Sequence, residues 1–360
     1  MKRLNYLKKC QWLQNRFGLS VYSTLIILIA SSCLERIDII PEEAAPLLVV
    51  QGFVDNLGRV EVQLRATQDF SSFTNEGILN GAQVELVEND NLMVPLADFG
   101  DNRFLNTSNE FSFQVGNTYK IRVLLANGEI YESDEETILP PIDILDANVR
   151  LTENRFLDKN KVPQISYSHN ITVQLANEEE DQFFITGNSG FEQVEISYPV
   201  ECGFSAPSTP RVCWAFRESI VSGDINLGTN VNLAKTNYDF LAQEVPFRFK
   251  REYVANIRIQ RMDVEQFNFW QDVKNQLNRP GSLFDPEFAP IVGNIRQANG
   301  TKVALGYFSA YGASERLVCF DRFDVPVVSN LPADPSCSVP CTDWFAPATF
   351  QDVSSFLCRE

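Results

Sequence analysis

Residues 119–132 read YKIRVLLANGEIYE, and this stretch decides the fold class. Ile121 and Val123 alternate with Arg122, which is the period of a β-strand. Asn127-Gly128 joins this run to a second one, and Asn-Gly between two such runs is the strongest short-range signal of a β-hairpin. The stretch therefore predicts two antiparallel strands and an all-β fold built around them.

Similar short runs, separated by turn residues, precede the hairpin at residues 47–54, 60–66 and 82–88. Regular strands over about 95 residues are typical of a small sandwich. We therefore expect an immunoglobulin-like or transthyretin-like β-sandwich over residues 47–141. Pro140-Pro141 interrupts any strand or helix and marks the predicted domain boundary.

Residues 142–360 are predicted to form a larger β-rich domain with one inserted helix. Partial alternation marks strands at residues 165–176, 182–188, 192–198, 253–262, 293–297, 303–310 and 316–320. Asp263 can cap a helix near residues 263–278, and Pro280-Gly281 ends it. Its stripe at three- to four-residue steps consists of Val264, Phe267, Trp270, Val273, Lys274 and Leu277. We expect the aromatic residues of this stripe to lie in the core, with a ligand platform as the alternative.

The start of the chain fits an export signal. Residues 1–32 carry basic side chains and no acidic one, and an apolar run of about a dozen residues leads into Ser31-Ser32-Cys33. A membrane-spanning helix needs about 20 apolar residues, so we expect cleavage and not a permanent span. Small residues before Cys33 resemble the lipobox of bacterial lipoproteins, in which the cysteine becomes the acylated N-terminus. An ordinary secreted protein cut near Ser32 is the alternative.

Beyond the predicted leader the chain is strongly acidic. The net charge is −17, and removal of Lys2, Arg3, Lys8, Lys9 and Arg16 with the leader leaves −22. Such a charge argues against nucleic acid, and against an anionic membrane face, as a partner. Residues 33–46, acidic and proline-containing, are predicted to be a tether. Acidic residues soon after a lipidated cysteine also resemble the signal that sends some lipoproteins to the outer face of the outer membrane.

Six cysteines remain when Cys10 and Cys33 are set aside. An even number in an exported chain predicts up to three disulfides. Cys202 and Cys213 flank a proline-containing loop, and we expect them to pair. The four remaining cysteines are expected to form disulfides among themselves and so to cross-link the C-terminal tail, and the order of pairing stays open: Cys319, Cys337, Cys341 and Cys358. Metal binding by the closely spaced cysteines of the tail is the disfavoured alternative, because no histidine stands near them.

The sequence singles out no catalytic residue, metal site or cofactor. His169 is the only histidine, so most nucleophilic mechanisms would depend on it, and we expect a structural or surface role instead. Asp98, Asp101 and Asn102 are rich in oxygen atoms but lack the full calcium-binding series, and a plain turn is favoured. Gly-rich phosphate loops are missing. A hydrolase with two facing carboxyl groups is a less favoured alternative.

An ordered set of segments resembles a known family. The set is LVVQGFV at 48–54, Phe269-Trp270, GSLFDP at 281–286, IVGNI at 291–295, LGYFSA at 305–310 and Trp344-Phe345 in the cysteine-containing tail. It is similar to an uncharacterised family of Bacteroidota lipoproteins, classed as domain of unknown function 4249 and typically encoded beside TonB-dependent outer-membrane receptors. The tail's cysteine spacing departs from the family, and Ala30 replaces the usual leucine of the lipobox.

The resemblance implies a non-enzymatic accessory lipoprotein that acts as a capture or lid subunit of a TonB-dependent receptor. It would be lipid-anchored at Cys33 in the outer membrane and face the cell surface. A structural or adhesive surface module is the alternative, and a small-molecule ligand is not identified. Four aromatic residues are candidates for rigid contacts to a receptor or ligand: Trp270, Phe284, Tyr307 and Phe308. For Phe284, Tyr307 and Phe308, positions in the core or in turns are the favoured interpretation.

Overall fold

The hairpin predicted at residues 119–132 is present as β7 (Thr118–Leu124) and β8 (Ile130–Ser133), with Leu124 opposite Ile130. The computed structural model describes residues 46–67, 79, 81–106, 112–177, 180–195, 212–218, 225–233, 236–247, 252–278 and 291–322, except the side chains of 193–195 and 212–218. The chain divides into two compact units, Met1–Ala45 and Pro46–Glu360, and every described residue belongs to the second. The predicted leader, Cys33 and most of the tether therefore lie outside the description.

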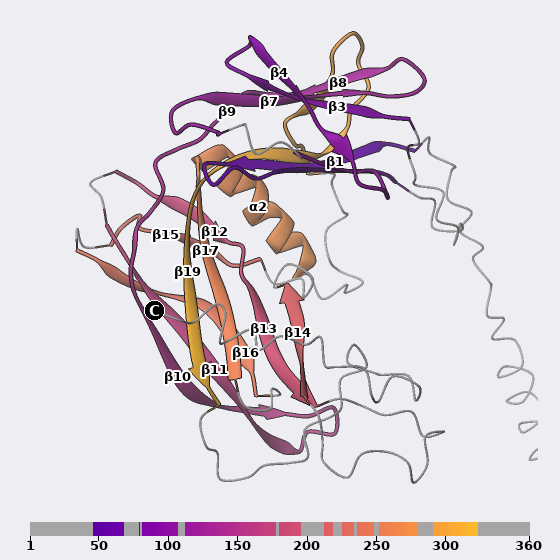
Figure 1. The fold of residues 1–360 in the computed structure, drawn as a ribbon. Coiled ribbons are helices and arrows are strands. Elements are labelled where there is room, and N and C mark those ends of the chain that lie inside the picture. The colour runs from indigo at the N-terminus through magenta and orange to yellow at the C-terminus, as the bar shows by residue number, and fades with distance from the viewer. Residues whose placement is uncertain are drawn as a thin grey trace, which may run out of the picture. The chain divides into compact units, whose positions relative to one another are not determined.

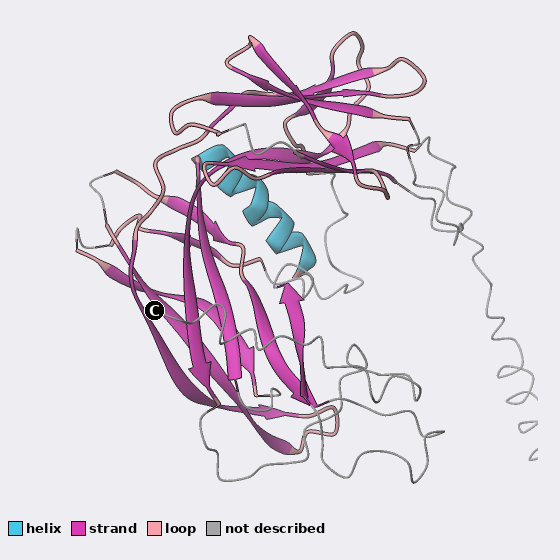
Figure 2. Ribbon diagram, in the orientation of Figure 1, coloured by secondary structure: helices cyan, strands magenta, loops and turns pink. Residues whose placement is uncertain are grey.

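The described part is mainly β, with several sheets and the helix α2 (Val264–Leu277), which confirms the predicted all-β class (Figure 2). No helix among the described residues has the length and apolar character needed to cross a membrane.

Two facing sheets enclose a first hydrophobic core. The first sheet contains β1 (Leu48–Asp55), β2 (Val60–Ala66), β5 (Ala97–Asp98), β6 (Arg103–Leu105) and part of β19 (Leu305–Asp321). The second contains β3 (Gln83–Glu88), β4 (Leu92–Pro95), β7, β8, β9 (Glu136–Thr137) and β18 (Ile295–Gln297). Val50 and Leu64 from one sheet meet Ile121 from the other in a single buried cluster. This is the layered packing of a β-sandwich.

A second core lies between the continuation of the first sheet and a separate three-stranded sheet. The three strands are β10 (Ile144–Leu157), β11 (Pro163–Leu175) and β16 (Tyr238–Pro246). The continuation consists of β12 (Phe183–Thr186), β13 (Ser189–Glu195), β14 (Val212–Glu218), β15 (Leu227–Thr229), β17 (Glu252–Met262) and the rest of β19. Ile171 and Val173 of β11 pack with Phe184 and Ile257 in this core.

Strand β19 belongs to both cores (Figure 1). Its first part pairs in parallel with β1, from Val49 opposite Leu305 to Asp55 opposite Tyr311. Its second part pairs antiparallel with β17, from Gly312 opposite Arg261 onward. The separate strands expected at residues 303–310 and 316–320 are thus one continuous strand, which changes partner between Tyr311 and Gly312.

The chain crosses closely over β19 where the strand changes partner. A Cβ atom on Gly312 would lie 2.0 Å from the carbonyl oxygen of Leu139. The first core includes Ile138 and the second begins with Ile142, so the chain passes from one core to the other across Pro140-Pro141. Because β18 and β19 return to the first core from the far end of the chain, the domain boundary at residue 141 stays a prediction.

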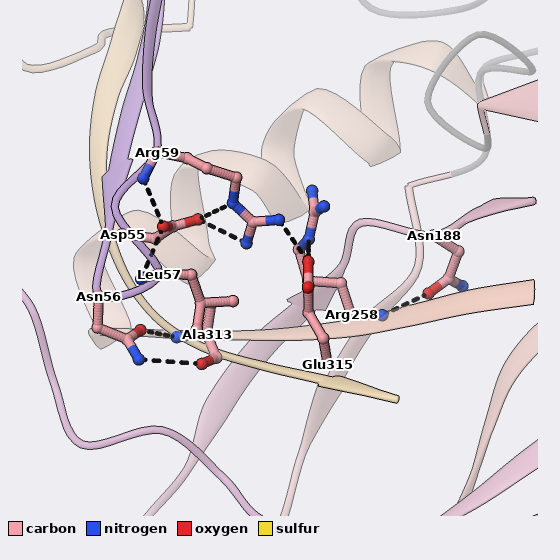
Figure 3. A network of polar contacts seen from close by, with 8 residues as sticks. All are labelled: Asp55, Asn56, Leu57, Arg59, Asn188, Arg258, Ala313 and Glu315. Carbon is pink, nitrogen blue, oxygen red and sulfur yellow. Dashed lines mark hydrogen bonds and ion pairs between the residues drawn. The ribbon is translucent and has the colours of Figure 1, made fainter. Parts of the chain in front are cut away.

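A polar junction holds the β1–β2 turn against β19 (Figure 3). The Asn56 side chain donates to the Ala313 carbonyl oxygen at 3.2 Å and accepts from the Ala313 amide at 2.6 Å. The fully buried Asp55 carboxylate accepts from the amides of Leu57 at 3.0 Å and Arg59 at 3.1 Å, and from Arg59 Nε at 2.7 Å. The turn is therefore fixed both within itself and to the shared strand.

The same junction reaches β17 through Glu315. Both Arg59 and Arg258 form ion pairs with this carboxylate, and Arg258 Nε lies 2.6 Å from Glu315 Oε1. Burial acts to raise the pKa of Glu315, but the hydrogen bonds from the two guanidinium groups hold it below its ordinary value. Three strands of the long sheet, β1, β19 and β17, are thus connected by charged side chains as well as by backbone pairing.

Gly312→Ala is expected to lower the free energy of unfolding by about 3 kcal/mol, because the added methyl group meets backbone that cannot rotate away. Urea denaturation followed by circular dichroism measures the change. Gly300→Ala is the matched control, since its Cβ would meet only the flexible Gln297 side chain and should cost less than about 1 kcal/mol. Equal losses for the two variants would contradict the crossing described at Gly312.

Candidate functional site

Helix α2 carries the first candidate binding residue, Trp270, and both of its ends have the residues that a helix favours. The Asp263 side chain accepts from the Gln266 amide at 2.8 Å and caps the helix start, as predicted. Glu265 lies in the first turn and Lys274 in the last, and both charges suit the helix dipole. The helix predicted near residues 263–278 is confirmed.

The apolar stripe of α2 is only half-buried. Phe267 packs on Phe183 of β12, with ring centroids 5.1 Å apart. Val264 is 48% exposed and Leu277 is 60% exposed, while Trp270 is intermediate. The expectation that the aromatic residues of this stripe lie in the core is therefore met only in part.

Trp270 and Tyr307 are brought together by one aromatic ring between them. The ring centroid of Phe269 lies 4.8 Å from that of Tyr307 on β19 and 5.5 Å from that of Trp270. Phe308, the next residue of β19, points to the opposite face and is fully buried in the first core. Of the four candidate residues, Trp270 and Tyr307 thus share a site, Phe308 is a core residue, and Phe284 lies outside the described residues.

A buried carboxyl group lies beside Tyr307. Asn294 Nδ2 donates to Glu136 Oε1 at 2.7 Å and to the Phe308 carbonyl oxygen at 2.8 Å, and Asn294 Oδ1 accepts from the Phe308 amide at 2.9 Å. Burial raises the pKa of Glu136 to about 7, against the hydrogen bond from Tyr307. Burial and the neighbouring Glu136 also raise the pKa of Tyr307. This group of residues ties β9, the segment before β18 and β19 together.

The seat of α2 on β19 contains an imperfectly paired amide. Gln266 is the one buried residue of α2, and neither polar atom of its side chain makes a hydrogen bond of ordinary geometry. It lies near the Tyr311 hydroxyl, whose pKa burial raises to about 12. The Tyr311 hydroxyl is the group with which this amide interacts across the contact between α2 and β19.

The polar groups in the interior of this site are buried and already engaged in hydrogen bonds. Glu136 is 5% exposed and its oxygens are engaged by Asn294 and Tyr307, while the nearby Asp263 carboxylate caps α2. Among the described residues, no group of three or more His, Cys, Asp or Glu side chains is arranged to hold a metal ion. On α2, Phe269 and Trp270 are half-buried, while Val264 and Leu277 are exposed together with four polar residues: Glu265, Asn268, Asp272 and Asn275.

The other residues examined in the sequence occupy structural positions. His169 is fully buried, stacks on Phe247 at 5.6 Å and packs against Phe320 at 5.4 Å. Burial lowers the pKa of His169 to about 4, so the ring is neutral at physiological pH. Asp98 accepts from the Gly100 amide at 2.8 Å in the turn between β5 and β6, which is the plain turn that we favoured.

Cysteine pairing is described at one position. Cys319, on β19, is disulfide-bonded, and its partner is not among the described side chains. Cys202, Cys213, Cys337, Cys341 and Cys358 lie where no side chain is described. Their pairing stays a prediction.

Three residues of the site were not predicted: Glu136, Gln266 and Asn294. Each is polar and far in sequence from the others, so no local pattern indicates a shared position. One signal was present in the IVGNI and LGYFSA segments. A Cβ atom on Gly293 would lie 1.5 Å from the Gly306 carbonyl oxygen, so the two segments pack backbone against backbone and Asn294 is held beside β19.

Glu136→Gln is expected to flatten the pH dependence of stability. The folded-state pKa of about 7 lies above the ordinary value of 4.5, so the native state binds the extra proton between these pH values. Protonation of Glu136 stabilises the folded state fully below pH 4.5. As the pH rises to about 7 this contribution is lost, and the free energy of unfolding falls by about 3 kcal/mol. Urea denaturation at pH 5 and pH 8 checks this, with Asp239→Asn at an exposed position of β16 as control. An unchanged slope in Glu136→Gln would contradict the assignment.

Asn294→Ala is expected to lower the free energy of unfolding by about 3 kcal/mol, because it leaves buried polar atoms of Glu136 and Phe308 without partners. Chemical denaturation measures this loss. Asn148→Ala, at an exposed position of β10, serves as control and should change stability by less than about 0.5 kcal/mol. A loss as small as that of the control would count against the role of Asn294.

Comparison with known proteins places this architecture in one family. No curated protein matches the chain. The family model described as "Domain of unknown function (DUF4249)" matches residues 35–316, a span that includes β1, α2, the Gly293-Asn294 segment and most of β19. Because this match covers well over half of the sequence, the chain belongs to the DUF4249 family.

Proposed function

We propose that this protein is a non-enzymatic outer-membrane lipoprotein that docks on a TonB-dependent receptor as a capture or lid subunit. Acylation of Cys33 would hold it at the cell surface, and residues 33–46 would act as its tether. Confinement to the plane of the membrane raises the effective concentration of the protein near its receptor. The proposal combines the leader sequence with membership of the DUF4249 family.

The observation that carries the proposal is the outward side of α2. Leu277 is exposed, Trp270 is half-buried, and the half-buried Phe269 contacts both Trp270 and Tyr307. Trp270 and Leu277 are seven residues apart, which is the spacing of two anchors on one face of an amphipathic helix that binds a groove on a partner. Aromatic anchors of this kind often carry most of the binding energy of an interface.

The seating of α2 supports the same proposal. The helix buries the polar side chain of Gln266 against β19 and leaves Val264 and Leu277 exposed. Both features lower stability, and sites that bind partners often retain such costs. A helix with only a structural role would gain stability from apolar burial at these positions.

Affinity purification from gently solubilised outer membranes tests the proposal. The tagged protein is expected to recover one stoichiometric TonB-dependent receptor, identified by mass spectrometry, and Cys33→Ala should recover much less. Recovery of the lipoprotein without any receptor would contradict the proposal. That result would favour the alternative of a structural or adhesive surface module, for which two β-sandwich cores joined by one strand are a suitable rigid body.

The double variant Trp270→Ala/Leu277→Ala is expected to reduce receptor recovery about tenfold or more, because hot-spot side chains contribute about 2 kcal/mol or more each. The matched control is Leu92→Ala on β4, where a side chain of similar exposure lies on the first sandwich. Circular dichroism establishes that the variants fold. Equal recovery by both variants would exclude α2 as the docking element.

A further inference from the structure

The β10–β11 hairpin continues past the edge of its own sheet. The two strands pair from Ile144 opposite Leu175 to Leu157 opposite Pro163. Strand β16 accompanies β11 only as far as the pair Ser168 and Pro246. Residues 155–166, here called the hairpin tip, are all exposed except Asp158, which is intermediate.

The hairpin tip has a defined shape. Asp158 Oδ1 accepts from the amides of Asn160 at 2.8 Å and Val162 at 2.9 Å. The Asp158 amide donates to the Val162 carbonyl oxygen at 3.0 Å, and the Lys161 amide donates to the Asp158 carbonyl oxygen at 2.9 Å. Binding of a partner would therefore require little ordering of this turn, which favours association.

Large apolar side chains are gathered on the hairpin tip. Phe156 is 52% exposed, Leu157 63%, Val162 48% and Ile165 56%. The pairing register places Leu157 and Ile165 on one face of the hairpin and Phe156 on the other. Apolar groups on both faces and at the turn suit insertion of the end of the hairpin into an apolar layer, because packing against a flat surface would use only one face.

The local charge of the hairpin is opposite to that of the chain. Residues 150–166 carry four basic and two acidic side chains, a net charge of +2, while the whole chain carries −17. Lys159 and Lys161 are exposed at the turn, and the carboxylate of the preceding Asp158 accepts hydrogen bonds from backbone amides. The total charge argues against an anionic membrane as a partner, but it does not describe this part of the surface.

We propose that the hairpin tip inserts into the headgroup region of a bilayer that contains anionic lipids. Phe156, Leu157, Val162 and Ile165 enter the boundary between headgroups and acyl chains, and Lys159 and Lys161 contact the phosphates. Basic side chains beside aromatic and aliphatic ones are the composition of peripheral membrane-binding segments. This contact is independent of the lipid on Cys33 and of any receptor.

Sedimentation with vesicles tests the proposal. The probe is the chain without its leader, residues 33–360 with Cys33→Ser, mixed with phosphatidylcholine vesicles that contain or lack phosphatidylglycerol. Binding is expected to the anionic vesicles, to weaken as salt is added, and to be much lower for pure phosphatidylcholine. Failure of this chain to bind anionic vesicles overturns the proposal.

Variants assign the binding to the tip. Phe156→Ser/Leu157→Ser is expected to lower the partition coefficient at least about tenfold, and Lys159→Glu/Lys161→Glu is expected to lower it about tenfold or more. Phe99→Ser is the matched control, because Phe99 is 60% exposed in a turn of the first sandwich and lies in no basic segment. Unfolding midpoints establish that the variants fold. Binding of the hairpin variants equal to that of the control overturns the proposal.

Receptor recovery with the same variants separates this proposal from the proposed function. Loss of vesicle binding with normal receptor recovery is the expected result. If the hairpin variants lose the receptor while the unmodified tip binds no vesicle, the lipid proposal is overturned and the tip is a protein contact.

Discussion

The structure depends on a single strand that is shared by two hydrophobic cores. In its first part β19 lies parallel to β1 and delivers Phe308 to the first core. In its second part it lies antiparallel to β17 and delivers Val318 to the second. A strand cannot shift its register in one half without shifting it in the other, so the two sandwiches constrain each other. The polar junction around Asp55 and Glu315 holds the β1–β2 turn where the two halves meet.

The candidate site is built on this shared strand, and its properties follow from that position. Tyr307 alternates with Phe308, so the face of β19 opposite the first core is available to α2. Glu136 and Asn294 fix the strand from the side of the first sandwich. The interior of the site is therefore rigid and closed by hydrogen bonds, whereas its outward side is a half-buried helix with exposed apolar residues. The proposed recognition of a partner surface rests on this combination.

Sequence patterns predicted elements that have local signals, but not the features that depend on contacts between distant parts of the chain. Asn127-Gly128 and Asp263 are local signals, and the hairpin and helix that they predict are present. Strands β10 and β16 were not predicted, because much of each strand is solvent-exposed and the apolar alternation that marks a half-buried strand is weak there. The continuity of β19 was hidden by Gly312, which looks like an interruption but is required by the close crossing of Leu139. Glu136, Gln266 and Asn294 meet only through tertiary contacts, which a single sequence does not show.

The pairing of β1 with β19 also constrains how the chain can fold. The contact between Asn56 and Ala313 joins residues 257 positions apart, so the first sandwich cannot close until nearly all of the described chain has been synthesised. Contacts of such high sequence separation slow folding. For the export proposed for this chain, slow closure would be an advantage, because a polypeptide that is still incomplete stays unfolded while it is transferred. The pairing of β1 with β19 thus makes closure of the first sandwich wait for the last described strand.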